Sequence, residues 1–385
     1  MAQQHQHNPI DAVLELLNQQ GSDSLRDALS LLFNAAMLLE RQRFLNAEPY
    51  ERTTERRDYA NGFKPKQLRS RVGELDLRVP QVRHGEFYPS AIERGTRSER
   101  ALKLAVAEMY VQGLSTRKVK AITEQLCGFA VTSMEVSRAP ADLDAVFQQW
   151  RERPLGAMPF VQMDARYEKV REGGVVIDQA ALTALGIDGA GKRHVLGVSV
   201  ERSEAEVHWR GFLQHLVKRG LSGVKLITSD DHAGLRAARV AVFASVNWQR
   251  CQFHLQQNAS PYVVRAEQRK EVARDLRAIF NAPSREEAER LLTAMTKKYE
   301  TSAPRLSAWL EVNVAEGLIV FAFPKDYQRR LRTSNLSERV NRELKRRTRV
   351  VSVFPNSASL ERLTTAVLIE IDEDWQSAPR YLPVT

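Results

Sequence analysis

The order of strands and helices between residues 160 and 250 constrains the fold more than any other feature of the chain. FVQMDARYEKV, ALTALGID and HVLGVSVE have the composition of strands. A helix from Glu204 to Lys218 comes next, and VKLITSDD and AGLRAARVAVF add a strand and a helix. The segment therefore predicts an α/β core. The residues expected to face inward on the first helix are Trp209, Phe212, Leu213 and Leu216.

Three strands, a helix, a strand and a helix match the start of a ribonuclease-H-like layout, although this order alone is not diagnostic. Helical patterns dominate on both sides of the core, and 385 residues exceed one ordinary domain. The expected regions are a helical and basic β region at 1–100, a helix-turn-helix-like region at 101–150, the first part of the core at 155–254, an all-helical insertion at 255–330, and the last part of the core at 331–385.

The charge balance favours a polyanion as partner. Lysine and arginine exceed the acids by ten, and the pI is near 9.7. A basic membrane-surface protein would share this balance, but no apolar run is long enough to span a bilayer, and the N-terminus lacks the pattern of a signal peptide. Two cysteines are too few for a disulfide framework, so we expect a cytoplasmic protein.

A small basic β element is expected between residues 52 and 83. Nine lysines and arginines stand there against four acids, and VGELDLRVP alternates with Leu75, Leu77 and Val79 on one face. Pro80 is expected to end the strand. A solvated hairpin would have the same pattern, but the small number of acids favours phosphate contact.

Residues 101–150 are expected to form short helices. Gly113 ends the first, Ser115 or Thr116 caps the second, and Thr132 or Ser133 starts a third, which Pro140 keeps short. A helix-turn-helix and an ordinary three-helix bundle fit these signals equally well. The apolar face of the second helix is expected to comprise Val119, Ile122 and Leu126, and its candidate DNA contacts are Arg117 and Lys118.

The helix expected in RTSNLSERVNRELKRRTRVV carries one acid within a basic strip. At about 100° per residue, Glu338 falls on the same side as three cations, and an apolar stripe lies roughly opposite. Such a face suits a metal ion beside a polyanionic backbone. The cations are Arg342, Lys345 and Arg349, and the stripe comprises Leu336, Val340 and Leu344.

Asp164, Asp230 and Glu338 are the candidate catalytic and metal-binding acids. The two aspartates are expected at strand ends, where ligands gather in α/β sheets, and a helix can bring the glutamate to the same edge. Three carboxylates suit Mg²⁺, with Mn²⁺ as a substitute. Each acid also has a structural interpretation. Asp164 could be a turn residue, Asp230 or Asp231 could cap the next helix, and Glu338 stands at capping-box spacing from Asn335.

Cys251 and His254 form the motif CQFH after a short strand. Half of a zinc site is one interpretation, but a structural zinc needs four ligands and the other cysteine, Cys127, lies in a distant helical region. A packed cysteine beside a hydrogen-bonding histidine is the better hypothesis.

The chain resembles the Mutator-type transposases carried by bacterial insertion sequences. Seven segments carry the resemblance in order from about Tyr50 to the C-terminus: YERTTERRDYANGF, VGELDLRVPQVRHGEFYPS, MYVQGLSTRKV, MDARYEKVR, SDDHAGLRAA, QRCQFH and RTSNLSERVNRELKRRTRVVSVFP. The resemblance implies a DDE triad on a ribonuclease-H-like core, with an all-helical insertion between the second Asp and the Glu.

By position, the triad residues would be Asp164, Asp230 and Glu338, and Cys251 and His254 would match the family's C-x-x-H signature. This chain has Asp231 where the family commonly has Gly, which leaves the choice between Asp230 and Asp231 open. Pro140 would lie in the recognition helix, which argues against base reading there.

The resemblance further implies a function. The protein would bind the terminal inverted repeats of its element, cleave the DNA with metal-activated water and join the freed 3′-OH to target DNA, as a homodimer or a larger assembly. A catalytically silent DNA-binding protein and a nuclease without strand transfer are the alternatives. The residues expected to contact DNA are Arg117, Lys118, Arg332, Arg342, Lys345, Arg346 and Arg349.

Overall fold

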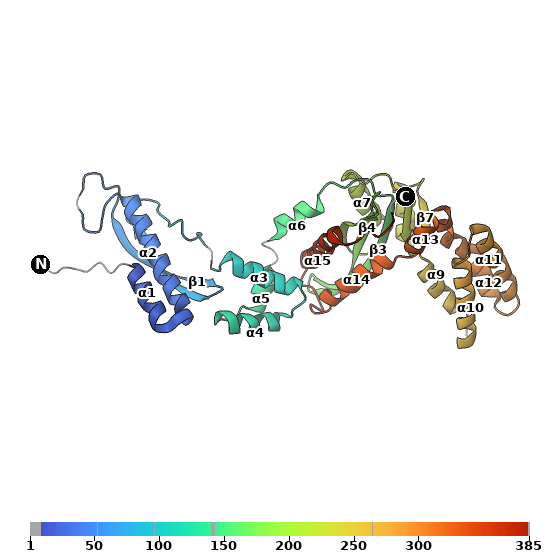
Figure 1. Cartoon of the computed structure of the whole chain (residues 1–385), viewed down its shortest axis with the longest axis horizontal. Coiled ribbons are helices and arrows are strands. Elements are labelled where there is room, and N and C mark those ends of the chain that lie inside the picture. Colours follow the sequence, from blue (N-terminus) through green and yellow to red (C-terminus); the bar gives the residue numbers. More distant parts are fainter. Residues whose placement is uncertain (1–8, 52, 96, 140–142, 264, 384–385) are drawn as a thin grey trace. The chain divides into compact units, whose positions relative to one another are not determined.

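The structure is a computed structural model, and it describes residues 9–51, 53–95, 97–139, 143–263 and 265–383. Its contacts divide the chain into two compact units, residues 1–140 and 141–385 (Figure 1). No helix in these described ranges is long and apolar enough to cross a membrane.

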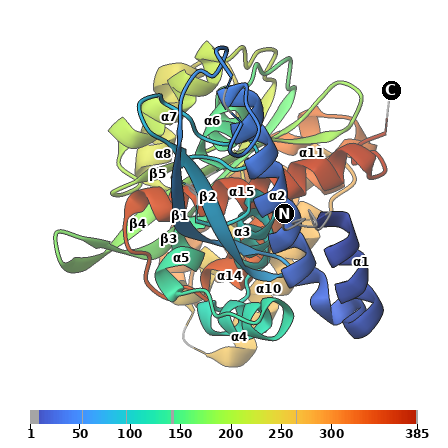
Figure 2. The same cartoon turned by 90° about the vertical axis from the view of Figure 1, so that its left-hand side faces the viewer.

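The first unit combines a two-stranded ribbon with helices, as expected. Figure 2 shows the long helix α2 along the ribbon, where Leu75 and Leu77 are buried against Met37. The expectation that Pro80 ends the strand is wrong, because β2 continues to Val82. An edge position beside an irregularity in the pairing tolerates proline. The elements are α1 (Pro9–Gln20), α2 (Leu25–Leu45), β1 (Ala60–Ser70), β2 (Gly73–Val82), α3 (Arg100–Val111), α4 (Thr116–Cys127) and α5 (Ser133–Arg138).

The three helices α3 to α5 begin and end at the expected signals. The Ser115 side chain caps α4, Gly128 ends it with a φ of 72°, and Thr132 forms a capping box with Glu135. The prediction for Leu126 is wrong, because its side chain is 74% exposed. Pro140 lies outside the described residues. The buried face of α4 comprises Val119, Thr123 and Cys127.

The second unit is built on a mixed five-stranded sheet with the order β5-β4-β3-β6-β7. Strands β3, β4 and β5 are antiparallel neighbours, and β6 and β7 run parallel to β3. The strands are β3 (Phe160–Glu172), β4 (Val175–Ile187), β5 (Arg193–Glu201), β6 (Leu226–Ser229) and β7 (Asn247–Arg250).

Helices surround this sheet, and the strand–helix order of residues 160–250 is the one predicted. The inward residues expected on α7 are all buried in the core. Helices α14 and α15 lie against the sheet (Figure 1). The helices of the sheet region are α6 (Asp144–Arg151), α7 (Glu206–Lys218), α8 (Ala233–Val242), α14 (Asn335–Thr348) and α15 (Ser357–Ser377).

Between β7 and α14 the chain is helical and has an apolar core of its own. Leu276, Tyr299, Leu306 and Leu310 are among its buried residues. This helical segment enters and leaves the sheet region at neighbouring points, since the Gln252 amide donates to the Arg332 carbonyl. Its helices are α9 (Gln252–Ala259), α10 (Ala266–Phe280), α11 (Arg285–Tyr299), α12 (Pro304–Asn313) and α13 (Lys325–Leu331).

Candidate active site

Asp164 and Asp230 lie at the same level of neighbouring parallel strands. The last residues that pair between β3 and β6 are Gln162 and Thr228. Asp164 follows Gln162 by two residues, and Asp230 follows Thr228 by two residues. Neighbouring strands are about 4.8 Å apart, so the carboxylates are close. The expected position of Asp164 at a strand end is wrong, because β3 continues to Glu172 in its hairpin with β4. Asp164 instead lies where β3 passes the end of the short strand β6.

The Asp164 carboxylate is a partly buried acid whose charge is disfavoured. Burial raises its pKa to about 7, the charges of Asp230 and Glu204 act in the same direction, and the Ala165 amide and His254 oppose them. Its two oxygens accept hydrogen bonds from the Ala165 amide and from Asn341 Nδ2, both at 2.9 Å. No lysine or arginine of the described residues forms an ion pair with Asp164 or Asp230.

Asp231, in contrast, belongs to a compensated ion network. Its carboxylate lies 2.8 Å from the Arg236 guanidinium and 3.0 Å from that of Arg250, which is only 3% exposed. Both arginines also pair with Glu316 of the helical segment. Neither Asp230 nor Asp231 caps α8, whose N-cap residue is His232. Asp231 therefore joins α8, β7 and the helical segment, whereas Asp230 forms no ion pair with a lysine or arginine of the described residues.

Glu338 lies in the first turn of α14, and its helix is tied to the aspartate site. Asn341, which donates to Asp164, follows Glu338 by three residues and therefore lies on the same helix face. The expected apolar stripe of this helix is buried. The capping interpretation is wrong, because the N-cap residue is Ser334 rather than Asn335, and no side chain caps this helix.

Hydrogen bonds fix the start of α14 against the sheet. Gln162, two residues before Asp164, donates from Nε2 to the Thr333 carbonyl at 3.1 Å and accepts from the Ser337 amide at 3.4 Å. The Thr228 hydroxyl donates to the Leu331 carbonyl at 2.9 Å. The strands that carry the two aspartates thus also hold the segment that leads into the Glu338 helix.

Cys251 provides a further anchor for this helix. Its buried thiol accepts from the Ser334 amide at 3.4 Å and from the Ser334 hydroxyl at 3.3 Å. His254 lies in the same motif, and its interaction with Cys251, followed by the charges of Asp230 and Asp164, raises the pKa of His254 to about 9 against the opposing effect of burial. The C-x-x-H motif therefore holds the start of α14 and keeps a positive charge near the two aspartates.

Sequence reasoning missed Glu204, a further acid near the aspartates. Its side chain is only 12% exposed and lies 3.7 Å from His232. Burial raises its pKa, and the charge of Asp230 adds to that effect. Gly234 at the start of α8 allows the backbone at Glu204 to pack closely against this helix, because a Cβ at Gly234 would lie 1.9 Å from the Glu204 carbonyl oxygen. Glu204 lies in the loop between β5 and α7, three residues after the strand ends at Glu201, so the strand-end rule points to this loop without selecting Glu204.

No group of three or more His, Cys, Asp or Glu side chains among the described residues is arranged to hold a metal ion. Asp164, Asp230 and Glu204 interact through their charges, while Glu338 lies on α14 one turn before Asn341, which contacts Asp164. The chemistry of these donors nevertheless suits a hard cation, because they are carboxylates that form no ion pair with a lysine or arginine of the described residues. The raised pKa of Asp164 shows that its neighbours do not fully stabilise its negative charge.

The basic candidates fall into two groups. Arg332 is bound to the protein itself, donating to the Phe280 carbonyl at 3.2 Å and to Asn281 Oδ1 at 2.7 Å, and Arg346 pairs with Glu343 at 2.6 Å. The other candidates are exposed and have no carboxylate partner among the described residues. These are Arg117, Lys118, Arg342, Lys345 and Arg349.

Comparison with known families gives a match over nearly the whole chain. The model described as "Transposase, Mutator family" matches residues 1–378. The chain belongs to the Mutator family of transposases. The resemblance inferred from the seven sequence segments is thereby confirmed.

Relatives of this transposase come from several bacterial insertion sequences. The transposase for IS406 of Burkholderia multivorans is 54% identical and covers 99% of each chain. The transposase for ISRM5 of Rhizobium meliloti is 42% identical, over 94% of this chain and 90% of the relative. The transposase for IS256 in transposon Tn4001 of Staphylococcus aureus is 34% identical, over 94% and 93%.

Among solved structures, an intasome of simian T-cell lymphotropic virus in complex with a PP2A regulatory subunit gives a TM-score of 0.19 and 10% identity, covering 53% of this chain and 66% of that one. A score this low carries no argument about the fold.

Proposed function

We propose that this insertion-sequence transposase is a DDE enzyme that cleaves DNA at the ends of its element and transfers the freed 3′-OH to target DNA. Asp164, Asp230 and Glu338 are the catalytic acids of a ribonuclease-H-like core. The observation that carries the proposal is the register of β3 and β6, which places Asp164 and Asp230 on neighbouring strands. Neither pairs with a lysine or arginine among the described residues, and α14, which bears Glu338, is hydrogen-bonded to Asp164 through Asn341.

These acids would hold Mg²⁺, or Mn²⁺ in its place, which supplies an activated water and neutralises charge on the reacting phosphate. Asp164 and Asp230 contribute hard oxygen donors from the sheet, and Glu338 contributes one from α14. Asn341 orients the Asp164 carboxylate through its hydrogen bond. Asp231 supports the proposal indirectly, because two arginines already neutralise it and leave Asp230 for the metal.

The DNA partner is inferred from family membership and charge. The exposed cations Arg342, Lys345 and Arg349 follow Glu338 on α14 or just after it, where they would neutralise phosphates next to the acids. We assign binding of the terminal inverted repeats to the first unit, whose helices α3 to α5 have helix-turn-helix signals. Joining two ends requires at least two copies of the chain, acting at the bacterial nucleoid.

The test is cleavage and joining of labelled DNA that ends in the element's terminal repeat, with Mg²⁺ and with Mn²⁺. Asp164→Asn, Asp230→Asn and Glu338→Gln should each lower cleavage by roughly three orders of magnitude, which corresponds to about 4 kcal/mol of barrier, while DNA binding persists. Asp231→Asn is the matched control and should keep measurable cleavage and joining once its folding is verified.

Normal cutting by the Glu338→Gln variant would refute the triad assignment. Cleavage without any joined product would instead identify a nuclease, and binding without cleavage by the wild type in both metals would identify a silent DNA-binding protein.

A further inference from the structure

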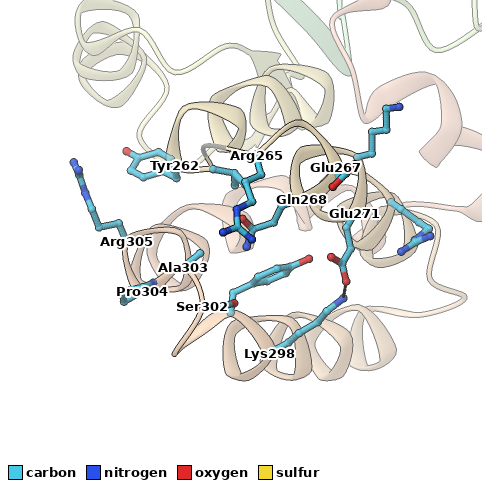
Figure 3. A pocket seen from close by; sticks show the side chains of 14 residues that line it. Tyr262, Arg265, Glu267, Gln268, Glu271, Lys298, Ser302, Ala303, Pro304 and Arg305 are labelled. Carbon is cyan, nitrogen blue, oxygen red and sulfur yellow. Dashed lines mark ion pairs between the residues drawn. The ribbon is translucent and has the colours of Figure 1, made fainter.

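A second concentration of charge lies in the helical segment between β7 and α14. A groove of about 940 Å³ is formed by residues at the start and middle of α10, at the end of α11 and at the start of α12. We call it the insertion groove. Figure 3 shows Arg265 reaching into it beside Gln268, with Tyr262 and Arg305 on one side and the Glu271–Lys298 pair on the other.

Four of the cations that line the insertion groove have no carboxylate partner among the described residues. Each is exposed. Three of them belong to α10 or its N-cap, and the fold brings the fourth, Arg305 of α12, to the same groove. A fifth cation, Lys298, is already neutralised by Glu271 at 2.7 Å and Asp275 at 2.6 Å. The four unpaired cations are Arg265, Lys270, Arg274 and Arg305.

Cations elsewhere in the same helical segment form ion pairs with acids. On the surface of α11, Arg285 pairs with Glu289 at 2.8 Å and Arg290 pairs with Glu287 at 2.6 Å. Glu267 and Glu271 also line the groove, yet among the described residues none of the four cations forms an ion pair with either of them. Like charges gathered in a concave surface repel each other and attract an anion.

The groove is built on rigid elements. Its floor includes Tyr299, which is buried and donates its hydroxyl to Asp275 at 2.9 Å. On the wall, the Tyr262 ring lies against the Trp309 ring with centroids 5.6 Å apart. Arginine guanidinium groups bind phosphate oxygens through paired N–H donors. Several arginines spaced along packed helices suit the successive phosphates of a backbone more than a single ion.

We propose that the insertion groove binds the sugar–phosphate backbone of double-stranded DNA, as a contact surface separate from the three catalytic acids and from the cations of α14. The proposal rests on the proposed function for the identity of its polyanion. Because the groove offers cations rather than a set of base-reading groups, the contact is independent of DNA sequence.

The test compares two double variants of the full-length protein that remove the same charge from the same helical segment. Arg265→Gln with Arg274→Gln removes two unpaired groove cations, and Arg285→Gln with Arg290→Gln removes two paired cations of α11. Binding to labelled terminal-repeat duplex and to a random duplex of equal length is measured by fluorescence anisotropy over a range of salt concentrations. Thermal unfolding establishes that each variant is folded.

We expect the groove variant to lower the slope of log K against log salt by about 2 on both duplexes, because each lost phosphate contact removes about 0.9. Its loss of affinity between about 50 and 200 mM salt would then be about tenfold smaller than that of the wild type. The α11 variant should keep the wild-type slope.

Equal slope changes in the two variants would overturn the proposal, because they would reflect net charge alone. An unchanged slope in the groove variant, or a change confined to the terminal-repeat duplex, would also overturn it. Cleavage by the wild type is scored separately with Mg²⁺, so a wild type that binds but never cleaves refutes the proposed function and leaves the groove result intact.

Discussion

The sheet edge that carries Asp164 and Asp230 and the insertion groove are opposites in charge, and in both the charges of one sign outnumber those of the other. The first gathers acids that form no ion pair with a lysine or arginine, and the second gathers four cations that form no ion pair with a carboxylate, among the described residues. Folding alone gains nothing from either arrangement, because like charges repel. Each therefore indicates a ligand of opposite charge: a hard cation at the sheet edge and phosphate in the groove.

The ion network of Asp231, Arg236, Arg250 and Glu316 provides the contrast to both sites. It is equally rich in charged groups, but each acid lies within 3.2 Å of both arginines. Such compensation is typical of a structural element. Charge density alone thus does not identify a ligand site in this protein, whereas missing compensation does.

The largest stability effect should come from breaking the compensated network. Arg250→Met leaves Asp231 and Glu316 with one arginine in place of two, and should lower the free energy of unfolding of the second unit by about 3 kcal/mol. Urea unfolding followed by tryptophan fluorescence measures it, since all five tryptophans lie in that unit.

Arg290→Met is the matched control for this variant. Arg290 also pairs with a glutamate, but its side chain is 66% exposed, so the loss should stay within about 0.5 kcal/mol. Equal losses in the two variants would contradict the structural role of the network.

The next effect should have the opposite sign. Asp164→Asn should stabilise the metal-free protein at pH 8 by about 2 kcal/mol, less than the full pKa shift implies, because asparagine keeps only one accepting oxygen. The folded protein holds the Asp164 proton up to about pH 7, whereas the unfolded chain releases it near pH 4. The cost of the charged group therefore grows between these values and is complete above pH 7.

Thermal unfolding of both proteins between pH 5 and 8 in a chelator measures this difference, which should shrink as the pH falls. Added Mg²⁺ should raise the melting temperature of the wild type and have little effect on the variant. A variant that is less stable than the wild type at pH 8 would show that Asp164 is compensated after all.

The smallest stability effect should come from the anchor of α14. Cys251→Ala removes the acceptor of two Ser334 hydrogen bonds and should cost about 1 kcal/mol. Cleavage should fall more than this loss of stability implies, because Glu338 lies one turn after Ser334 and depends on the same anchor for its position. Cys251→Ser keeps an acceptor and should recover part of the activity. If serine and alanine are equally impaired in the Mg²⁺-dependent assay while both fold, the sulfur does more than anchor the helix.

Local sequence signals were sufficient for the elements themselves. The alternation around Leu75 and Leu77, the caps at Ser115 and Thr132, and the stripe of α14 each depend on residues close in sequence, so their patterns predicted the observed elements. The errors at Pro80 and Leu126 arose because tertiary packing decides where a strand ends and which side of a helix is covered.

The sequence by itself determined the strand–helix order of the core, the basic balance, the three candidate acids and the family. Only the tertiary structure separated Asp230 from Asp231, by placing two arginines against the second aspartate. It also brought Glu204 close to the aspartates and placed Arg305 of α12 beside the cations of α10. These facts depend on contacts between residues far apart in the chain, and a side chain's charge is compensated or left uncompensated only when the fold chooses its neighbours.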